Sequence, residues 1–339
     1  MTANQAALLV EKLANPLRVK PVPYARPGPN EIVVKNAAWG LNHIDWRIQS
    51  LALFPVEYPA ILGEDVAGTV VEVGVEVSRF KKGDRVLGLS PWFQTKQSVH
   101  GAFQEYTVIP DNIASPIPDK MSFEDAAGLP LAVSTASVGL FDKEFLALQR
   151  PSKDIGPNGK TLLIWGGASA VGSSAIQLAI AAGYRVITTA SPKNFNLVTK
   201  LGASQVFDYH SVTVVEDIVQ ALNSQDLVGT YDAINRGGAI EVVADVVAKA
   251  GGDKTLATVS RIPGELPENV NVKWITATKI MDTNLGKAIF EDYLPSALSD
   301  NRFIIALETV IAGKGIEEIQ LGLDALAKGV SAKKIVVSV

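Results

Sequence analysis

Hydrophobic and polar positions follow two different patterns along the chain, and the change lies near residue 130. Before it, short alternating runs are interrupted by proline and glycine, as in EIVVKNAAW and AFQEYTVI. Such runs predict an antiparallel β domain with few helices. After about residue 122, apolar runs alternate with segments of helical period, which predicts a parallel sheet with right-handed crossovers.

The second region and the tail define the predicted architecture. Strands are expected at 161–165, 184–190, 205–208, 228–234, 254–259 and 271–275, and helices at 171–182, 193–201, 214–223 and 239–249. A long helix around 315–328 and the strand KKIVVSV then return the chain to the first region. We therefore expect an α/β fold, in which a doubly wound parallel sheet is inserted into an antiparallel β domain, with a dinucleotide cleft between the two.

The segment 161–193 predicts a dinucleotide-binding site. An apolar run ends at Gly166 and Gly167, a turn of small residues follows, and a helix and a second apolar run come next. This order presents backbone N–H groups and the positive end of a helix to a pyrophosphate. The usual G-x-G-x-x-G appears as GASAVG, with Ser169 as the middle residue. A turn that only packs helix on strand is the alternative. The predicted ligands are Gly167, Ala168, Ser169, Ala170, Val171 and Gly172.

The end of the second predicted strand indicates which dinucleotide binds. An NAD site usually has an acidic residue there, which accepts a hydrogen bond from the ribose 2′-OH. No acidic residue occurs from Val186 to Thr199, and the strand ends in Ser191 and Lys193. A hydroxyl and a cation suit the 2′-phosphate of NADPH, so we predict NADPH as the cofactor. A helix cap at Ser191, with Pro192 next and a solvated lysine, is compatible with the same residues.

Composition and charge exclude several classes of protein. The chain has 339 residues, a net charge of −4 and no cysteine, so it is long enough for two domains and offers no basic surface to nucleic acid. The lack of cysteine removes disulfides, thiolate zinc ligands and thiol nucleophiles. The N-terminus has no secretory pattern, and no charge-free apolar stretch reaches about 18 residues. We expect a cytoplasmic protein that acts on a small molecule, without nucleic-acid or membrane partners.

Several motifs together resemble the medium-chain dehydrogenase/reductases. The turns GEDVAGTVVEVG and FKKGDRV precede the dinucleotide region, and a GVSAKKIVV strand closes the chain. The motifs LNHIDWR, LPLAVSTA, GGASAVG, TTASPKNFNLVTKLGA and VFDYH resemble a zinc-independent branch that contains quinone-oxidoreductase-like proteins and fungal enoyl reductases. The resemblance implies a Rossmann-type domain over 129–299, inserted into a GroES-like substrate domain formed by 1–128 and 300–339.

The resemblance also shows where this chain departs from the zinc-dependent members. Those members keep a cysteine and a histidine as zinc ligands at positions that here match Asn42 and Glu64. Asparagine is a poor zinc ligand, and one glutamate cannot hold the ion alone. The histidines His43, His100 and His210 have no short metal-ligand spacing. We therefore predict no metal site.

Without zinc, reduction of an activated C=C bond is favoured over alcohol oxidation. Hydride addition to an α,β-unsaturated carbonyl makes an enolate, whose oxygen needs hydrogen-bond donors and whose α-carbon needs a proton. A full alkoxide benefits more from a Lewis acid. The resemblance implies Asn42 and Asp45 as catalytic candidates on the substrate side and Thr135 on the nicotinamide side. Trp46 and Tyr58 are candidates for substrate contact.

These candidates also have structural explanations. Asp45 could hold its loop through Arg47 or a backbone N–H. Trp46 could be a core residue, and Asn42 could serve a turn. Tyr209, in VFDYH, matches a family tyrosine near the adenosine phosphate, but it could equally be a half-buried residue at a strand end.

Three functions remain open at this point. The favoured one is an NADPH-dependent reductase of activated C=C bonds or quinones. The others are a metal-free, NADPH-dependent reductase of reactive aldehydes, and an NADPH-binding sensor or structural protein without turnover.

We interpret Lys333 and Lys334 as a solvated pair before an edge strand. The alternative, which the resemblance implies, is a turn that runs close to the cofactor. The sequence does not give the oligomeric state, but the strands at 254–259 and 271–275 could pair across a twofold axis in a homodimer.

Overall fold

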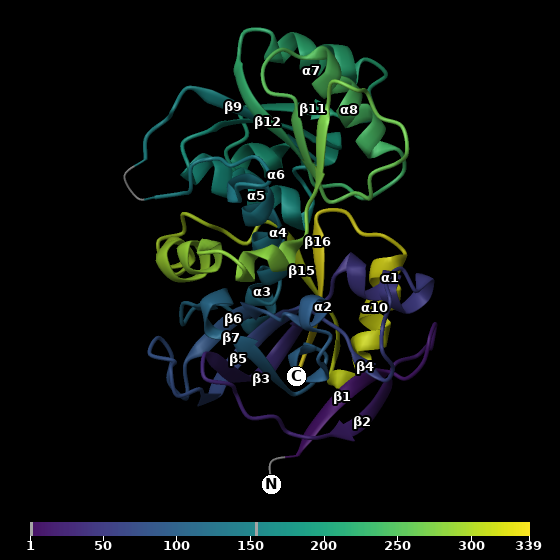
Figure 1. Ribbon diagram of the computed structural model, residues 1–339, viewed down its shortest axis with the longest axis vertical. Coiled ribbons are helices and arrows are strands. Elements are labelled where there is room, and N and C mark those ends of the chain that lie inside the picture. The colour runs from purple at the N-terminus through teal and green to yellow at the C-terminus, as the bar shows by residue number, and fades with distance from the viewer. Residues whose placement is uncertain (1–2, 153–154) are drawn as a thin grey trace. The chain divides into compact units, whose positions relative to one another are not determined.

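A computed structural model describes residues 3–152 and 155–339 of the chain. The chain divides into two compact units, and Figure 1 labels many of the elements of both. The first unit consists of Met1–Leu131 and Gly286–Val339, and the second of Ala132–Leu285. The second is therefore an insertion in the first.

The first unit is built on two β-sheets, in which nearly all neighbouring strands are antiparallel. The smaller sheet has the order β2, β1, β4, and the larger β15, β16, β3, β5, β6, β8, with β7 paired to β3. Only β15 and β16 run parallel. The predicted antiparallel β domain is thus confirmed. The strands are β1 (Asn4–Leu9), β2 (Arg18–Val22), β3 (Glu31–Gly40), β4 (Ala60–Ile61), β5 (Asp65–Val73), β6 (Arg85–Leu89), β7 (Tyr106–Pro110), β8 (Ala114–Pro116), β15 (Glu308–Lys314) and β16 (Lys333–Ser338).

The helices of this unit are short, as expected for chain that mainly connects strands. One of them, α1, begins directly after Asn42, where the extended backbone of β3 turns into a helix. The elements are α1 (His43–Leu51), α2 (Trp92–Thr95), η1 (Ser98–His100), η2 (Asp111–Ile113), α3 (Phe123–Ala126), η5 (Lys287–Tyr293), α9 (Leu294–Ser299), η6 (Ile316–Glu318) and α10 (Ile319–Ala327).

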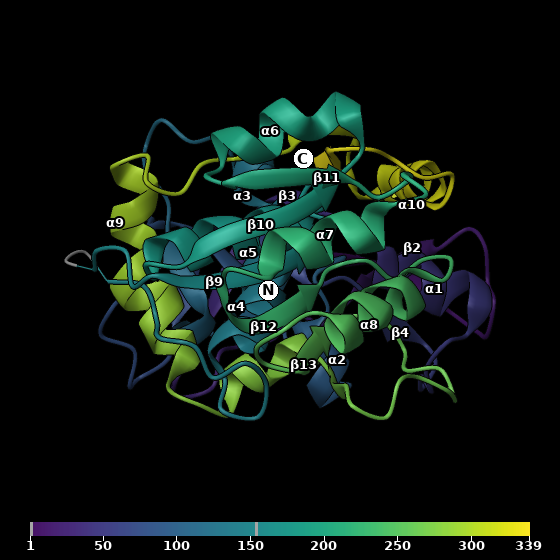
Figure 2. The same ribbon diagram turned by 90° about the horizontal axis from the view of Figure 1, so that it is seen from above.

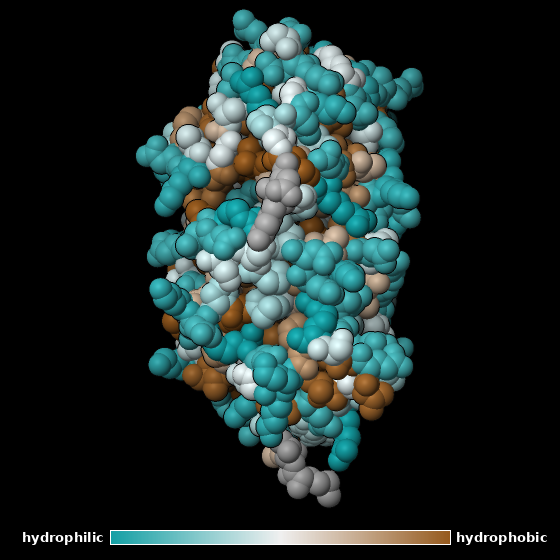
Figure 3. All heavy atoms as spheres, turned by 90° about the vertical axis from the view of Figure 1, so that its left-hand side faces the viewer, coloured by the Kyte–Doolittle hydropathy of each residue, from teal (hydrophilic) through white to brown (hydrophobic). Residues whose placement is uncertain are grey.

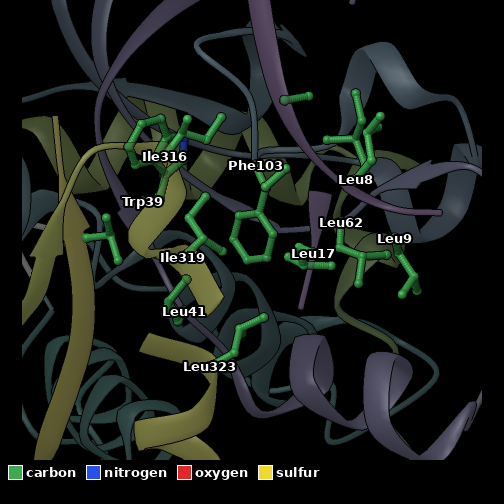
Figure 4. Close-up of a cluster of buried hydrophobic side chains, with 14 of the residues drawn as sticks. Leu8, Leu9, Leu17, Trp39, Leu41, Leu62, Phe103, Ile316, Ile319 and Leu323 are labelled. Carbon is green, nitrogen blue, oxygen red and sulfur yellow. The ribbon is translucent and has the colours of Figure 1, made fainter. Parts of the chain in front are cut away.

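A hydrophobic core fixes both α1 and the C-terminal helix to the sheets. Figure 4 shows Phe103 at the centre of this core, among leucines of β1, Ile316 of η6 and Ile319 at the start of α10. Leu41 and Ile48, which flank the first turn of α1, belong to the same buried cluster. Fully burying such a side chain contributes about 1.5–3 kcal/mol. The start of α1 is therefore anchored from both sides.

The segment 286–299 packs with the first unit, although the sequence analysis places it with the nucleotide domain. Arg79, next to Phe80 in the FKKGDRV turn, donates to the carbonyl of Phe290 at 3.3 Å and pairs with Glu291 at 3.3 Å. These contacts join positions that are more than 200 residues apart in sequence. Local periodicity carries no information about such contacts.

The second unit contains a six-stranded parallel sheet, as predicted. Its order is β11, β10, β9, β12, β13, β14. From β9 the chain runs outward through β10 to β11. It then returns to β12, beside β9, and runs outward on the other side through β13 to β14. The neighbours β9 and β12 mark the point where the strand order reverses, which is where ligands bind in such sheets. The strands are β9 (Lys160–Trp165), β10 (Arg185–Ala190), β11 (Gln205–Asp208), β12 (Asp226–Asp232), β13 (Thr255–Thr258) and β14 (Asn271–Trp274).

Helices connect these strands, and Figure 2 labels α5 to α8 beside them. Residues 161–165 of β9 are all buried. Because successive side chains point to opposite faces, both faces of the sheet are covered at this strand, as is usual for parallel sheets. Leu163 and Trp165 share a core with α7 and α8. The predicted helix at 193–201 begins as a 3₁₀ turn at Pro192. The elements are α4 (Pro130–Phe141), α5 (Ala170–Ala181), η3 (Pro192–Asn194), α6 (Phe195–Lys200), α7 (Val214–Leu222), α8 (Ala239–Lys249) and η4 (Ala277–Met281).

The two strands predicted to pair across a twofold axis have different positions in the sheet. The strand β13 lies between β12 and β14, so its backbone is already paired on both sides. The strand β14 lies at an edge of the sheet, and its Trp274 is 44% exposed. Of the two expected strands, only β14 offers an edge to a second copy.

The face of the protein drawn in Figure 3 is largely hydrophilic. On the face in Figure 3, hydrophobic side chains form small groups among polar ones, which is normal for a globular protein. Within residues 3–152 and 155–339, no helix is both long and apolar enough to span a membrane.

Candidate functional site

The glycine turn after β9 is held by hydrogen bonds to the neighbouring strand β10. Gly166 has a φ of 84°, which favours glycine. Its N–H donates to the Thr189 hydroxyl, and the N–H of Gly167 donates to the Thr189 carbonyl, both at 2.9 Å. The turn is therefore fixed at the carboxyl end of the sheet.

The two glycines of the GASAVG motif, Gly167 and Gly172, permit close packing of α5 against this turn. A Cβ at Gly172 would lie 2.2 Å from the carbonyl oxygen of Gly166. A Cβ at Gly167 would lie 2.3 Å from the Thr188 hydroxyl. Both distances are far below van der Waals contact. The packing explanation of the glycines therefore holds, and it brings the N-terminus of α5 close to the end of β9.

Ser169 caps α5 and leaves two N–H groups of its first turn without a helical partner. Its hydroxyl accepts the N–H of Gly172 at 3.0 Å. The first N–H groups of any helix have no intrahelical acceptor, so those of Ala170 and Val171 remain for a ligand. Together with the positive helix end, they fit a pyrophosphate. This turn can hold a nicotinamide dinucleotide.

Ser191 and Lys193 follow β10 at the same edge of the sheet. Ser191 is the N-cap of η3, with Pro192 in its first position, and its hydroxyl accepts from the Asn194 amide at 3.1 Å. The hydroxyl hydrogen of Ser191 is therefore still available to a phosphate. Lys193 is exposed, and it forms no ion pair among the residues that the structure describes.

The fold adds an acidic residue that the sequence analysis did not consider. In the parallel pairing of β10 and β11, Asp208 lies beside Ala190, the last residue before Ser191. Its carboxylate accepts from the backbone N–H of His210 and contacts Nδ1 of that ring, each at 3.0 Å. The 44% exposed Tyr209 stacks on His210, with 4.0 Å between ring centres. A search of the adjacent strand, rather than of β10 alone, would have found Asp208.

In the first unit, the start of α1 places Asn42 and Asp45 together. The Asp45 carboxylate accepts the backbone N–H of Asn42 at 2.8 Å and is 1% exposed. This is the loop-holding contact that the sequence analysis gave as its structural alternative. Arg47 instead lies over the ring of Trp46, 5.5 Å from its centre.

Lys334 joins this group, contrary to the prediction of a solvated lysine. Its Nζ donates to Oδ1 of Asn42 and to Oδ2 of Asp65, both at 2.7 Å. The residue is 6% exposed. The prediction was wrong because β16 lies between β15 and β3, so alternate residues face opposite sides of a covered sheet. The neighbouring Lys333 is exposed and pairs with Glu308 at 3.3 Å.

Asp65 connects this group to the start of α4. Its Oδ2 also accepts from Nδ2 of Asn42 at 2.9 Å, and its Oδ1 accepts the N–H of Leu131 at 2.7 Å. A carboxylate is stabilised at a helix N-terminus. Thr135, one turn further along α4, is buried, and its carbonyl accepts from the Tyr231 hydroxyl at 2.9 Å.

Burial disfavours the ionised form of two carboxyl groups near Asp65, those of Asp45 and Glu64. Burial, together with the nearby charge of Asp65, raises the pKa of Asp45 to about 7, although the backbone N–H of Asn42 acts against this. Burial and the charges of Asp45 and Asp65 raise the pKa of Glu64 well above its usual range. Near neutral pH, the cluster therefore carries much less negative charge than its three carboxyls would suggest.

The raised pKa of Asp45 predicts a pH-dependent stability. The folded protein keeps a proton on Asp45 up to about pH 7, whereas the unfolded chain loses it near pH 4. The free energy of unfolding should therefore fall as the pH rises between these values, by up to about 1.4 kcal/mol per pH unit. Asp45→Asn should flatten this slope in urea unfolding at pH 5, 6 and 7.

Asp119→Asn, at an exposed position, is the matched control and should keep the wild-type slope. An unchanged slope in Asp45→Asn would show that Asp45 is ionised throughout this range. Glu64 contributes a slope of the same sign, so the flattening should be partial.

Trp46 and Tyr58 have different environments. Trp46 is half-buried, packs against the core that contains Leu41, and donates its indole N–H to Nδ1 of His43 at 3.0 Å. The indole N–H of Trp46 therefore already has a hydrogen-bond acceptor. Tyr58 is 36% exposed, in the loop after α1.

The three histidines lie in separate contacts. His43 accepts from Trp46, His100 contacts Glu31 at 3.0 Å, and His210 contacts Asp208. Within the described part of the chain, no group of three or more histidine, aspartate or glutamate side chains is arranged to hold a metal ion.

Known proteins match both units. Residues 28–119 match the alcohol dehydrogenase GroES-like domain, and residues 170–299 match the zinc-binding dehydrogenase family. The chain is 47% identical to the zinc-binding alcohol dehydrogenase domain-containing protein cipB of Emericella nidulans, over 99% of this chain and 98% of that protein. It is 38% identical to the trans-enoyl reductase himH of Aspergillus japonicus, over 99% and 97%. An alcohol dehydrogenase superfamily protein from Novosphingobium aromaticivorans, 25% identical, has a TM-score of 0.80 with both chains fully covered.

A GroES-like unit, a doubly wound parallel sheet and these relatives define an NAD(P)-dependent oxidoreductase. The chain belongs to the medium-chain dehydrogenase/reductases, in the branch that contains fungal trans-enoyl reductases.

Proposed function

We propose that this protein uses NADPH to reduce activated C=C bonds of α,β-unsaturated carbonyls, or quinones, without a metal ion. One observation carries the proposal. At a position that matches a zinc ligand of the zinc-dependent members, the structure has the amide of Asn42, bound to a buried ammonium and a carboxylate. An amide next to a cation suits a developing oxyanion rather than a metal.

The chemistry that Asn42 would support is stabilisation of an enolate. When bound, the nicotinamide ring would supply a hydride to the β-carbon. The C=C π pair would then form the new double bond between the α-carbon and the carbonyl carbon, and the C=O π pair would move to the oxygen. Nδ2 of Asn42 carries two hydrogens, of which one is donated to Asp65. The second can bind the enolate oxygen. The α-carbon then takes a proton from water or a nearby acid, which completes the addition of two hydrogens.

The residues around the glycine turn support NADPH as the cofactor. Ala170 and Val171 offer N–H groups to the pyrophosphate, and Ser191 and Lys193 offer a hydroxyl and a cation to the 2′-phosphate. Asp208 lies near this position and would favour NADH if its charge were free. The carboxylate is instead engaged by His210. We further propose that Thr135 steadies the nicotinamide, that Tyr209 lies along the adenosine, and that Tyr58 borders the substrate.

The test is NADPH oxidation with quinones, enones, enals and simple aldehydes, followed by product analysis on an enal. We expect the saturated aldehyde, at a rate that a chelator does not change. If allylic alcohol were the only product, with the C=C bond intact, the protein would be an aldehyde reductase instead. NADPH binding without turnover of any acceptor would favour a sensor or structural protein. Zinc at one ion per chain, lost together with activity, would contradict the metal-free part of the proposal.

A further inference from the structure

Lys334 is a buried cation whose only hydrogen-bond partners in the described chain are Asn42 and Asp65. A charge inside a protein is tolerated only when it is paired and hydrogen-bonded. For stability alone, well-packed apolar residues would often serve as well as a buried ion pair. The pair therefore calls for an explanation beyond stability.

The three residues form a closed ring of hydrogen bonds. Lys334 donates to Asn42 and Asp65 at 2.7 Å each, and Asn42 donates to the same Asp65 oxygen at 2.9 Å. In this ring the amide has one stable orientation. Exchanging its oxygen and nitrogen would direct N–H groups at an ammonium and an oxygen at a carboxylate.

One hydrogen of the Asn42 amide remains outside this ring, and its direction is fixed by the ring. Asn42 lies at the N-cap of α1, Asp65 at the start of β5, and Lys334 near the start of β16. Three separate elements thus hold one amide. This exceeds what a helix cap needs, because the backbone N–H of Asn42 is already bound to Asp45.

We propose that Lys334 and Asp65 are positioning residues, which aim the free amide N–H of Asn42 at the enolate oxygen formed during reduction. This inference rests on the proposed function and adds two residues to it. Neither residue touches the substrate. The pair is neutral overall, so it orients the amide without placing an unpaired negative charge beside the developing enolate.

The neighbouring carboxyls are consistent with this role. Burial and the charges of Asp45 and Asp65 raise the pKa of Glu64 well above its usual range, which disfavours a further negative charge beside the ring. A hydrogen-bond donor aimed at an oxyanion is most effective in a fixed, water-poor setting without nearby unpaired negative charge. The ring and its surroundings provide these conditions.

The test compares Lys334→Met, Asp65→Asn and the double variant Lys334→Met/Asp65→Asn. Lys333→Met is the matched control, because this adjacent lysine is exposed and pairs with Glu308. For each variant, kcat, KM, the NADPH dissociation constant and the thermal midpoint are measured. Lys334→Met leaves Asp65 buried without its cation and should lower the thermal midpoint. The double variant removes both charges and should regain much of that loss.

The double variant separates positioning from stability. If the ring aims Asn42, kcat should stay at least about 10-fold below wild type after stability returns, with the NADPH dissociation constant unchanged. Lys333→Met should match wild type in every measurement. Recovery of kcat along with stability would overturn the proposal and leave the pair a purely structural role. If Lys334→Met alone does not fold, the double variant still tests the proposal, because it removes both charges.

A second comparison shows whether Lys334 acts through Asn42. In the background of Asn42→Ala, adding Lys334→Met/Asp65→Asn should cost little further kcat, because groups that act as a unit are not additive. Independent, multiplicative losses would contradict the inference. A failure of the proposed function is distinguishable, because wild type itself would then reduce no activated alkene or quinone.

Discussion

Replacing Asn42 by alanine should lower kcat for enone reduction by about 10²–10³, because this is the usual cost of removing one donor to an oxyanion. The free N–H of Asn42 stabilises charge that exists only in the transition state, so KM should change much less than kcat. Steady-state kinetics with one enone at saturating NADPH measures both constants. The NADPH dissociation constant should stay at its wild-type value, since Asn42 takes no part in the glycine turn.

Two controls separate this effect from a damaged helix start. Asn42 is the N-cap of α1, and losing such a cap costs about 1 kcal/mol of stability, so the thermal midpoint is measured alongside. Asn30→Ala removes an exposed amide that bonds Glu76 at 2.8 Å and should leave kcat unchanged. A loss in kcat of less than about threefold in Asn42→Ala would make Asn42 a packing residue, since an effective oxyanion donor contributes far more.

Lys193→Ala should weaken NADPH binding by about 10-fold to 150-fold while leaving NADH binding nearly unchanged. A hydrogen bond to a charged group contributes about 1.5–3 kcal/mol, and each 1.4 kcal/mol is about tenfold in affinity. Only NADPH carries the 2′-phosphate, so only its affinity should fall. Titration of each cofactor by nicotinamide fluorescence, at fixed ionic strength, gives the two dissociation constants.

Lys200→Ala is the matched control, because Lys200 is an exposed lysine of α6, the helix that follows Lys193. It should bind both cofactors like wild type. Lys193→Arg should retain most of the NADPH affinity, since a guanidinium also binds phosphate. An equal loss for both cofactors, or none for either, would remove Lys193 from the phosphate site.

The site could be predicted from sequence where its chemistry is local. The turn from Gly166 to Gly172 lies within one strand–turn–helix unit, and its small residues were sufficient to identify it. The capping contact between Asp45 and Asn42 is also local, and it was foreseen as one of two alternatives. Which of these residues bind the cofactor and the substrate stays a prediction.

Contacts between distant segments are not visible in the sequence. Asp208 belongs to β11, and only the pairing of β10 with β11 places it beside the end of β10. Lys334 was misjudged because a lysine next to an exposed lysine is usually solvated, and only the position of β16 between β15 and β3 shows that it is buried. In both cases, neighbouring strands rather than neighbouring residues define the environment.

The sequence by itself determined the elements, the parallel sheet, the antiparallel domain and the nucleotide turn. Hydrophobic period, glycine placement and capping act within a few residues, so they can be recognised without knowing the fold. The tertiary structure alone decided the ring around Asn42. Its partners lie 23 and 292 positions away, and the pKa of Asp45 depends on its own burial and on the charges of Asp65 and Lys334. Electrostatics in a protein interior depends on distance in space and exclusion of water, and neither is encoded in local periodicity.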